Sequence, residues 1–144
     1  MYNTLVMRKF FQLTLLAFLL VSAGLSAEED KAKSPEEIYD LSGRWVIILS
    51  NDLSRKQVTF DLEQKDGRPR GEMSASGLPP QKLDGRISDD KKVFFWGTYR
   101  DRSGASYDYE FKGEIEGEPG QEKLVGRSDF FRKRYDFEGT RVKD

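Results

Sequence analysis

Residues 106–115 read Ser-Tyr-Asp-Tyr-Glu-Phe-Lys-Gly-Glu-Ile, and this stretch decides the fold class. Apolar or small residues alternate with charged or polar ones, so Tyr107, Tyr109 and Phe111 fall on one face of an extended chain and Asp108 falls on the other. A period of two is typical of a β-strand with one buried and one solvated face. The segment therefore predicts a half-buried strand of an antiparallel sheet.

The same alternation recurs along the chain, and no segment after Gly43 has helical periodicity. The eight alternating runs are Arg44 to Leu49, Gln57 to Gln64, Arg70 to Ser76, Lys82 to Ser88, Lys92 to Arg100, Ser106 to Ile115, Lys123 to Phe130 and Tyr135 to Val142. Turn-forming residues separate them, among them Asp66-Gly67 and Pro79-Pro80. Eight short, evenly spaced strands predict an all-β, eight-stranded antiparallel up-and-down barrel after one short helical turn that begins at Ser34. A two-sheet sandwich is the alternative.

Six of these runs contain a glycine followed, two residues later, by another residue of the same strand face. The six glycines are Gly71, Gly85, Gly97, Gly113, Gly126 and Gly139. Each shares its face with the apolar residues of its strand, so each is expected to point inward. An inward glycine lets a strand coil sharply, or it leaves space for a neighbouring aromatic ring or a ligand.

The two ends of the strand pattern resemble the calycin family, which includes lipocalins and avidins. The first strand begins Asp40-Leu41-Ser42-Gly43-Arg44-Trp45, and the last contains Gly139-Thr140-Arg141-Val142. In calycins a Gly-x-Trp opens the barrel, and in lipocalins a late arginine packs over that tryptophan. The resemblance implies that Gly43, Trp45 and Arg141 form the structural signature, with the guanidinium stacked on the ring.

The same first strand is similar to that of bacterial periplasmic inhibitors of secreted metalloproteases, which match over residues 41–46. Those barrels normally carry a disulfide, and this chain has no cysteine. The chain also has Val46 where lipocalins usually have a larger residue, and it lacks the lipocalin carboxy-terminal helix. Nothing matches the avidin biotin site.

The amino terminus has the order of a cleavable secretory signal. Arg8 and Lys9 precede a twelve-residue, mostly apolar core and then small residues up to Ala27. We therefore expect a signal peptide at 1–27, a charged linker with a short helix at 28–40, and a barrel domain at 41–144. A retained membrane anchor is the less favoured alternative, and either Met1 or Met7 serves as the start. The expected location is periplasmic or secreted, with no transmembrane anchor after cleavage.

Composition excludes several chemistries. The 144 residues contain no cysteine and no histidine, so Cys nucleophiles, Ser-His dyads and the usual zinc sites are absent. Loss of residues 1–27 removes two basic and no acidic residues, which takes the net charge from −1 to −3. Basic and acidic residues are balanced, so we expect no nucleic-acid partner. No carboxylate pair sits in a catalytic motif, and we expect no catalytic residues, no metal, no cofactor and no enzymatic activity.

The candidate site follows from the topology of an up-and-down barrel, because the loops after strands 1, 3, 5 and 7 share one rim. That rim would gather basic residues, namely Arg55, Lys56, Lys82, Arg100, Arg102, Arg132, Lys133 and Arg134. A cavity lined by aromatic residues beneath it would suit a small amphipathic ligand with an anionic head. The predicted ligand-binding residues are Phe60, Phe95, Tyr99, Tyr107, Tyr109, Phe111, Arg102, Arg132 and Arg134.

Two functions remain open from the sequence. The first is a lipocalin-like binding protein in the cell envelope, which requires a hollow barrel. The second is a non-enzymatic interaction module, such as an inhibitor or an assembly factor, with a solid barrel. Eight strands leave an interior only just wide enough for side chains, so inward aromatics can simply fill it. Outward-facing Phe94 and Trp96, with Val125 and Phe131, or else the rim loops, would then contact a protein partner.

Overall fold

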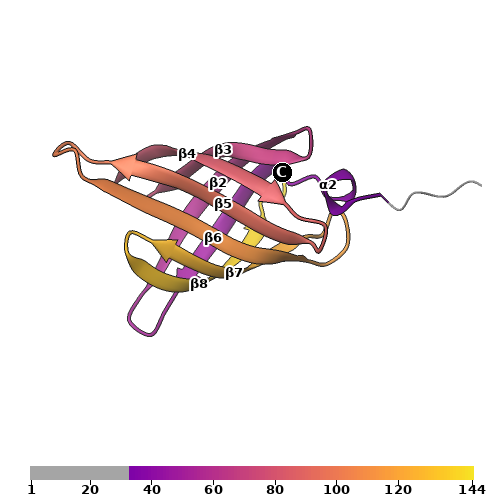
Figure 1. Ribbon diagram of the computed structural model, residues 1–144. Coiled ribbons are helices and arrows are strands. Elements are labelled where there is room, and N and C mark those ends of the chain that lie inside the picture. Colours follow the sequence, from indigo (N-terminus) through magenta and orange to yellow (C-terminus); the bar gives the residue numbers. More distant parts are fainter. Residues whose placement is uncertain (1–32) are drawn as a thin grey trace, which may run out of the picture. The chain divides into compact units, whose positions relative to one another are not determined.

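The computed structural model describes residues 33–144, and they form a closed antiparallel barrel of eight strands in up-and-down order (Figure 1). A single helical turn, α2 (Pro35–Ile38), precedes the barrel. The strands are β1 (Gly43–Ser50), β2 (Arg55–Lys65), β3 (Arg68–Ala75), β4 (Leu78–Ile87), β5 (Lys92–Arg100), β6 (Ser106–Glu116), β7 (Lys123–Phe130) and β8 (Lys133–Arg141). The all-β up-and-down barrel predicted from the alternation is confirmed. The predicted signal at 1–27 lies outside the described residues, and among residues 33–144 no helix is long and apolar enough to cross a bilayer.

Each strand pairs with the next, and β8 closes the sheet by pairing with β1. That last pairing runs from Trp45 opposite Arg141 to Ser50 opposite Asp136. Closure leaves every strand with two neighbours, so the barrel has no free sheet edge. The two-sheet sandwich is therefore not the architecture of this domain.

The hydrophobic core lies inside the barrel. Because side chains alternate along a strand, every second side chain points into it. The largest fully buried side chains are Trp45, Tyr109, Phe60, Phe95 and Phe111. Burial of an aromatic side chain of this size contributes on the order of 2 to 3 kcal/mol. With no disulfide in the chain, this interior is the main source of stability.

One end of the barrel is closed by the segment that leads into β1. Tyr39 and Leu41 are buried there, and the side chain of Gln64 joins both to the barrel. Its Nε2 donates to the Tyr39 carbonyl at 2.8 Å, and its Oε1 accepts from the Leu41 amide at 2.9 Å. The Tyr39 hydroxyl donates to the Gly117 carbonyl at 3.4 Å. We call this the closed end, and α2 lies beside it (Figure 1).

The inward glycines make room for rings on neighbouring strands. A Cβ atom on Gly97 would lie 2.2 Å from the Tyr109 hydroxyl, and one on Gly85 would lie 2.6 Å from the Phe95 ring. Contacts this short are impossible for real side chains. Gly97 and Gly85 therefore leave the space that the Tyr109 and Phe95 side chains occupy.

The expectation that Pro79 and Pro80 separate two strands was wrong, because β4 already begins at Leu78. The pairing of β3 with β4 shifts between Met73 and Ala75, with Ala75 opposite Leu78 and Met73 opposite Gln81. Proline has no backbone N–H and is tolerated where a ladder is interrupted. The irregular pairing here meets that requirement.

Candidate functional site

Four of the predicted ligand-binding residues lie together in the middle of the barrel. Phe60, Phe95, Tyr109 and Phe111 are all fully buried. The Phe60 ring centroid lies 4.9 Å from that of Phe111 and 5.4 Å from that of Phe95, both in edge-to-face geometry. Edge-to-face rings at these distances are in direct contact. These side chains form one packed cluster.

Two further predicted ligand-binding residues lie towards the end of the barrel that is away from α2. Tyr99 and Tyr107 are half-buried and face each other across β5 and β6, with ring centroids 6.3 Å apart. Phe131 packs edge-on against both, at 5.9 and 5.7 Å. We call Tyr99, Tyr107 and Phe131 the mouth cluster. Phe131 also lies 6.3 Å from Tyr109, so this cluster continues into the buried one.

Phe131 was expected to point outward, and this was wrong. The β7–β8 hairpin has only two connecting residues, Phe131 and Arg132, and both have positive φ angles, 49° and 65°. Such a two-residue turn has the φ signs of a type I′ turn, which usually contains glycine or asparagine. The left-handed turn swings the Phe131 ring over the end of the barrel, where its contacts with Tyr99 and Tyr107 hold it. The simple alternation of β7 ends at Phe130.

The basic rim lies at the same end of the barrel as the mouth cluster. It consists of Arg55, Lys56, Arg100, Arg102, Arg132, Lys133 and Arg134, which lie in or next to the connections after β1, β5 and β7. The guanidinium of Arg132 lies 5.4 Å from the centre of the Tyr107 ring, a cation–π contact. Of the predicted site residues, Arg102 lies in the β5–β6 loop, Arg132 in the turn and Arg134 in β8. Lys82 does not belong to this rim, because it lies within β4 and points outward beside Asp84.

Most of the rim cations lack a carboxylate partner. Within residues 33–144, only Arg134 among them forms an ion pair, with Asp129 at 3.5 Å. By contrast, outward cations on the strands are commonly paired, as Lys112 is with Glu110 at 3.2 Å and Lys123 with Glu138 at 2.8 Å. The rim therefore presents positive charge that neighbouring acids do not neutralise directly.

Asp101 fixes the shape of the β5–β6 loop. One of its carboxylate oxygens accepts hydrogen bonds from the Ser103 hydroxyl at 2.6 Å, the Ser103 amide at 2.8 Å and the Ala105 amide at 3.0 Å. The hydrogen bond from the Ser103 hydroxyl is the main reason that the pKa of Asp101 is lowered from its usual value. This acidic residue of the rim is thus used within its own loop, next to Arg102.

Tyr109 links the buried cluster to β4, because its hydroxyl donates to the Lys82 carbonyl. Burial, with a smaller effect of Asp84, raises the pKa of Tyr109 to about 12. The phenol is uncharged at neutral pH, where it keeps the donated hydrogen bond.

We expect the barrel to lose stability in alkali through Tyr109. The folded pKa lies above the value of about 10 for an unfolded chain, so the contribution is complete below pH 10 and is lost as the pH rises towards 12. The loss should reach about 2 to 3 kcal/mol. Urea unfolding of the protein and of Tyr109→Phe between pH 8 and pH 12 measures it. Equal slopes of unfolding free energy against pH in the two proteins would contradict the prediction.

The structural signature is at the closed end. The guanidinium of Arg141 lies 4.7 Å from the centre of the Trp45 ring. Its Nη atoms donate to the carbonyls of Ser42 and Asp40, and Nη2 forms an ion pair with Glu122 at 3.2 Å. Glu122 was not predicted from the sequence, because it sits in a loop rich in glycine and proline, which has no periodicity.

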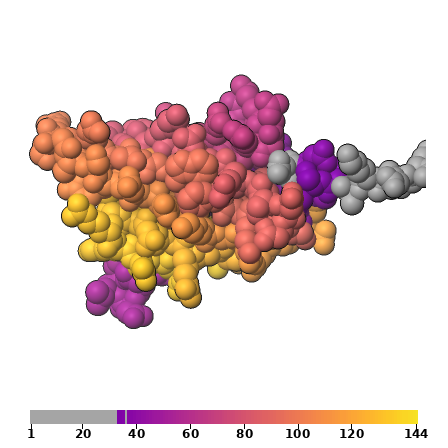
Figure 2. Space-filling model, in the orientation of Figure 1, coloured from indigo at the N-terminus to yellow at the C-terminus, as the bar shows by residue number. Residues whose placement is uncertain are grey.

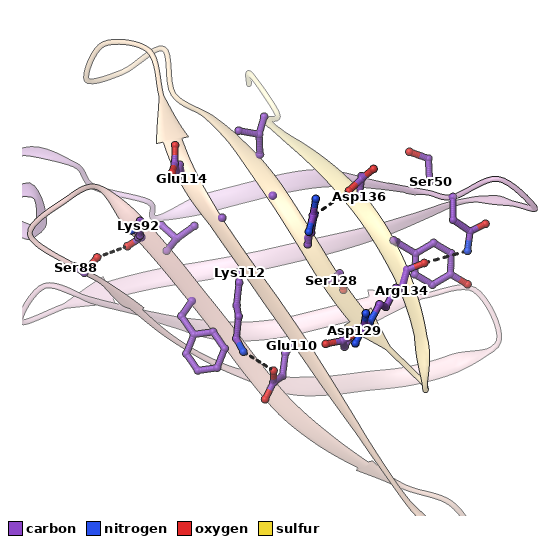
Figure 3. Close-up of a pocket in the computed structure, with 18 of the residues that line it drawn as sticks. Ser50, Ser88, Lys92, Glu110, Lys112, Glu114, Ser128, Asp129, Arg134 and Asp136 are labelled. Atoms are coloured by element: carbon purple, nitrogen blue, oxygen red, sulfur yellow. Dashed lines mark hydrogen bonds and ion pairs between the residues drawn. The ribbon is translucent and has the colours of Figure 1, made fainter.

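A groove of about 1240 Å³ runs over the outer face of β5 to β8 (Figure 3). Its charged walls are internally paired: Glu110 lies beside Lys112, and Asp129 beside Arg134. Phe94 is one of its lining residues. The groove is mixed in charge, so it offers no preference for an anionic or a cationic ligand.

The β1–β2 loop stands out from the barrel beside β8 (Figure 2). Asn51 holds its base, since its Nδ2 donates to the Arg134 carbonyl at 3.1 Å and its Oδ1 accepts from the Leu53 and Ser54 amides. Leu53 at the tip is 94% exposed. The described residues contain no cluster of three acidic side chains placed to hold a metal ion.

Comparison with known proteins finds no match to this chain among protein-family models, curated proteins or solved structures.

Proposed function

We propose that this chain is an exported, non-enzymatic, lipocalin-like binding protein of the cell envelope that takes a small molecule with an apolar body and an anionic head. Export rests on the signal-like residues 1–27, and the binding mode rests on the barrel end that carries the mouth cluster. The single observation that carries the proposal is that the unpaired Arg132 lies over the half-buried Tyr107 ring, at the barrel end where other unpaired cations gather.

The chemistry of that end supports this ligand class. The rings of Tyr99, Tyr107 and Phe131 are half-buried, so they offer an apolar surface that the protein covers only in part. Arg102 and Arg132 can supply hydrogen bonds to a carboxylate or phosphate, for which the guanidinium geometry is well suited. An anionic head would lie at the rim and an apolar body against the rings.

Packing in the middle of the barrel sets the depth of the proposed site. Phe60, Phe95 and Phe111 are in contact and fully buried. The middle of the barrel is therefore packed and not hollow, as the binding function was expected to require, so the proposed ligand lies at the mouth, against the rings of Tyr99, Tyr107 and Phe131.

A fluorescent fatty acid tests the proposal. We expect it to bind the purified protein, and we expect Arg102→Ser/Arg132→Ser to weaken binding about 10-fold or more, because each charge-assisted hydrogen bond contributes about 1.5 to 3 kcal/mol. The matched control is Arg68→Ser, which removes an exposed cation from the β2–β3 end of the barrel. Native mass spectrometry provides a second readout of bound ligand. Absence of binding in both measurements, or equal weakening by Arg68→Ser, would refute the proposal.

The packed cluster also favours a second candidate, the non-enzymatic interaction module with a solid barrel. In that function the rim loops contact a protein instead of a small molecule. Failure of every fatty-acid probe, together with capture of an acidic protein partner that Arg102→Ser/Arg132→Ser abolishes, would support this candidate.

A further inference from the structure

Two rows of opposite charge cross the outer face of β4, β5 and β6, and each is centred on an aromatic residue. In the first row, Arg86 and Lys112 stand opposite Phe94 on the two neighbouring strands. We call Arg86, Phe94 and Lys112 the cationic row. In the second, Asp84 and Glu110 stand opposite Trp96 in the same way. We call Asp84, Trp96 and Glu110 the anionic row.

Contacts within the rows order these side chains. The Arg86 guanidinium and the Lys112 ammonium each lie 5.3 Å from the centre of the Phe94 ring. The rings of Phe94 and Trp96 stack with centroids 4.9 Å apart and planes 23° apart. Both rings are half-buried on the outside of the barrel. The three strands form one continuous face (Figure 1), and the described contacts of the α2 region are at the closed end, not on it.

The rows are self-complementary under a two-fold rotation. They are two residues apart along the strands, which is about 7 Å. A two-fold axis that lies across the strands midway between the rows turns a second copy face to face with the first. The cationic row of each copy then meets the anionic row of the other. Phe94 meets Trp96, Arg86 meets Asp84, and Lys112 meets Glu110. Lys112 and Glu110 already pair within each chain at 3.2 Å, so the dimer brings two such pairs together in opposite directions.

From this arrangement we propose that the outer face of β4 to β6 is a homodimer interface and that its occupant is a second copy of this chain. Such an interface is isologous, since both copies use the same patch. The stacked aromatic rings supply the apolar centre, and the four charges set the orientation.

The match ends with these two rows, which limits the affinity. One row further out, Glu114 would face Asp108 of the second copy, which has the same charge. The two barrels also curve away from each other there. Six residues on each copy cover less than the roughly 800 Å² per partner of a standard stable interface. The dimer is therefore weak and concentration-dependent, and it should form between about 10 µM and 1 mM protein.

A charge-swap experiment tests the orientation as well as the association. The acidic variant is Arg86→Glu/Lys112→Glu, and the basic variant is Asp84→Lys/Glu110→Lys. Each variant alone places like charges opposite each other and should sediment as a monomer, with dimerisation weakened at least about 100-fold. An equimolar mixture restores every pair in a heterodimer. Sedimentation velocity of the mixture should show dimerisation within about 10-fold of the unmodified protein.

The matched control moves the same charge changes to β7 and β8. Its acidic variant is Lys123→Glu/Arg127→Glu and its basic variant is Asp136→Lys/Glu138→Lys, which reverse exposed partners on the outer face. These variants keep both rows, so each should dimerise by itself. If each control variant alone is instead monomeric and only their mixture dimerises, as in the test pair, net charge alone explains the result and the proposal fails.

Two further results test the dimer even if the double variants, with four like charges on one face, fail to fold. Lys112→Glu and Glu110→Lys as single variants disturb only β6, and their mixture should also recover dimerisation. Unmodified protein that stays monomeric up to about 1 mM would overturn the proposal. Fatty-acid binding at the barrel mouth does not involve β4 to β6 rows, so it should be the same in the monomeric variants.

Discussion

Arg141→Ala should lower the free energy of unfolding by about 3 to 5 kcal/mol, because it leaves a buried carboxylate without its partner. The Glu122 side chain is only 2% exposed and forms its ion pair with Arg141. The guanidinium also covers the Trp45 ring and donates to two backbone carbonyls at the closed end. No other residue in the described chain joins β8, the segment before β1 and the β6–β7 loop through one side chain in this way.

Urea denaturation measures the loss, and two variants separate its causes. Arg141→Lys keeps the charge but not the planar fork, so it should give an intermediate loss. Arg141→Ala/Glu122→Gln removes the buried charge together with its partner and should recover about 1 to 2 kcal/mol of the loss. A loss below about 1 kcal/mol for Arg141→Ala would show that the closed end does not depend on this contact.

The fold was predictable because its main signal is periodic. Alternation over runs such as 106–115 fixes the buried face of each strand, and turn residues fix the number of strands. Closure of β8 on β1 follows from the need to pair the last strand, and the Trp45 and Arg141 pairing lies at that seam. These features depend on local sequence and on one general rule of sheet architecture.

The candidate site was only partly predictable, because its key side chains depend on how separate elements meet. Phe131 reaches the mouth only through a left-handed turn made by two residues that rarely adopt one. Glu122 becomes important only when its loop folds against Arg141. The opposed rows on β4 to β6 require the register between three strands, which alternation alone does not give. The basic rim was easier, because the order of loops in an up-and-down barrel already gathers its residues.

Gly126→Ala is expected to be among the most damaging single-methyl additions in this barrel, with a loss of about 3 kcal/mol or more. Gly126 stands opposite Gly113 on β6. A Cβ atom on Gly126 would lie 2.1 Å from the Lys112 carbonyl oxygen and 2.4 Å from the Gly113 Cα. Both atoms belong to the backbone, so the strands themselves must separate to admit the methyl group, and the β6–β7 ladder weakens.

Gly139→Ala is the matched control, since it also places a methyl group inside the barrel. Its nearest neighbour would be the Cδ1 atom of Ile47 at 2.5 Å, the end of a flexible side chain, with the Leu124 Cβ next at 3.3 Å. Rotation of Ile47 relieves much of the overlap, so the loss should be about 1 kcal/mol. Urea denaturation of both variants gives the comparison. If the two variants lose equal stability, close approach of the β6 and β7 backbones is not the reason that position 126 needs glycine.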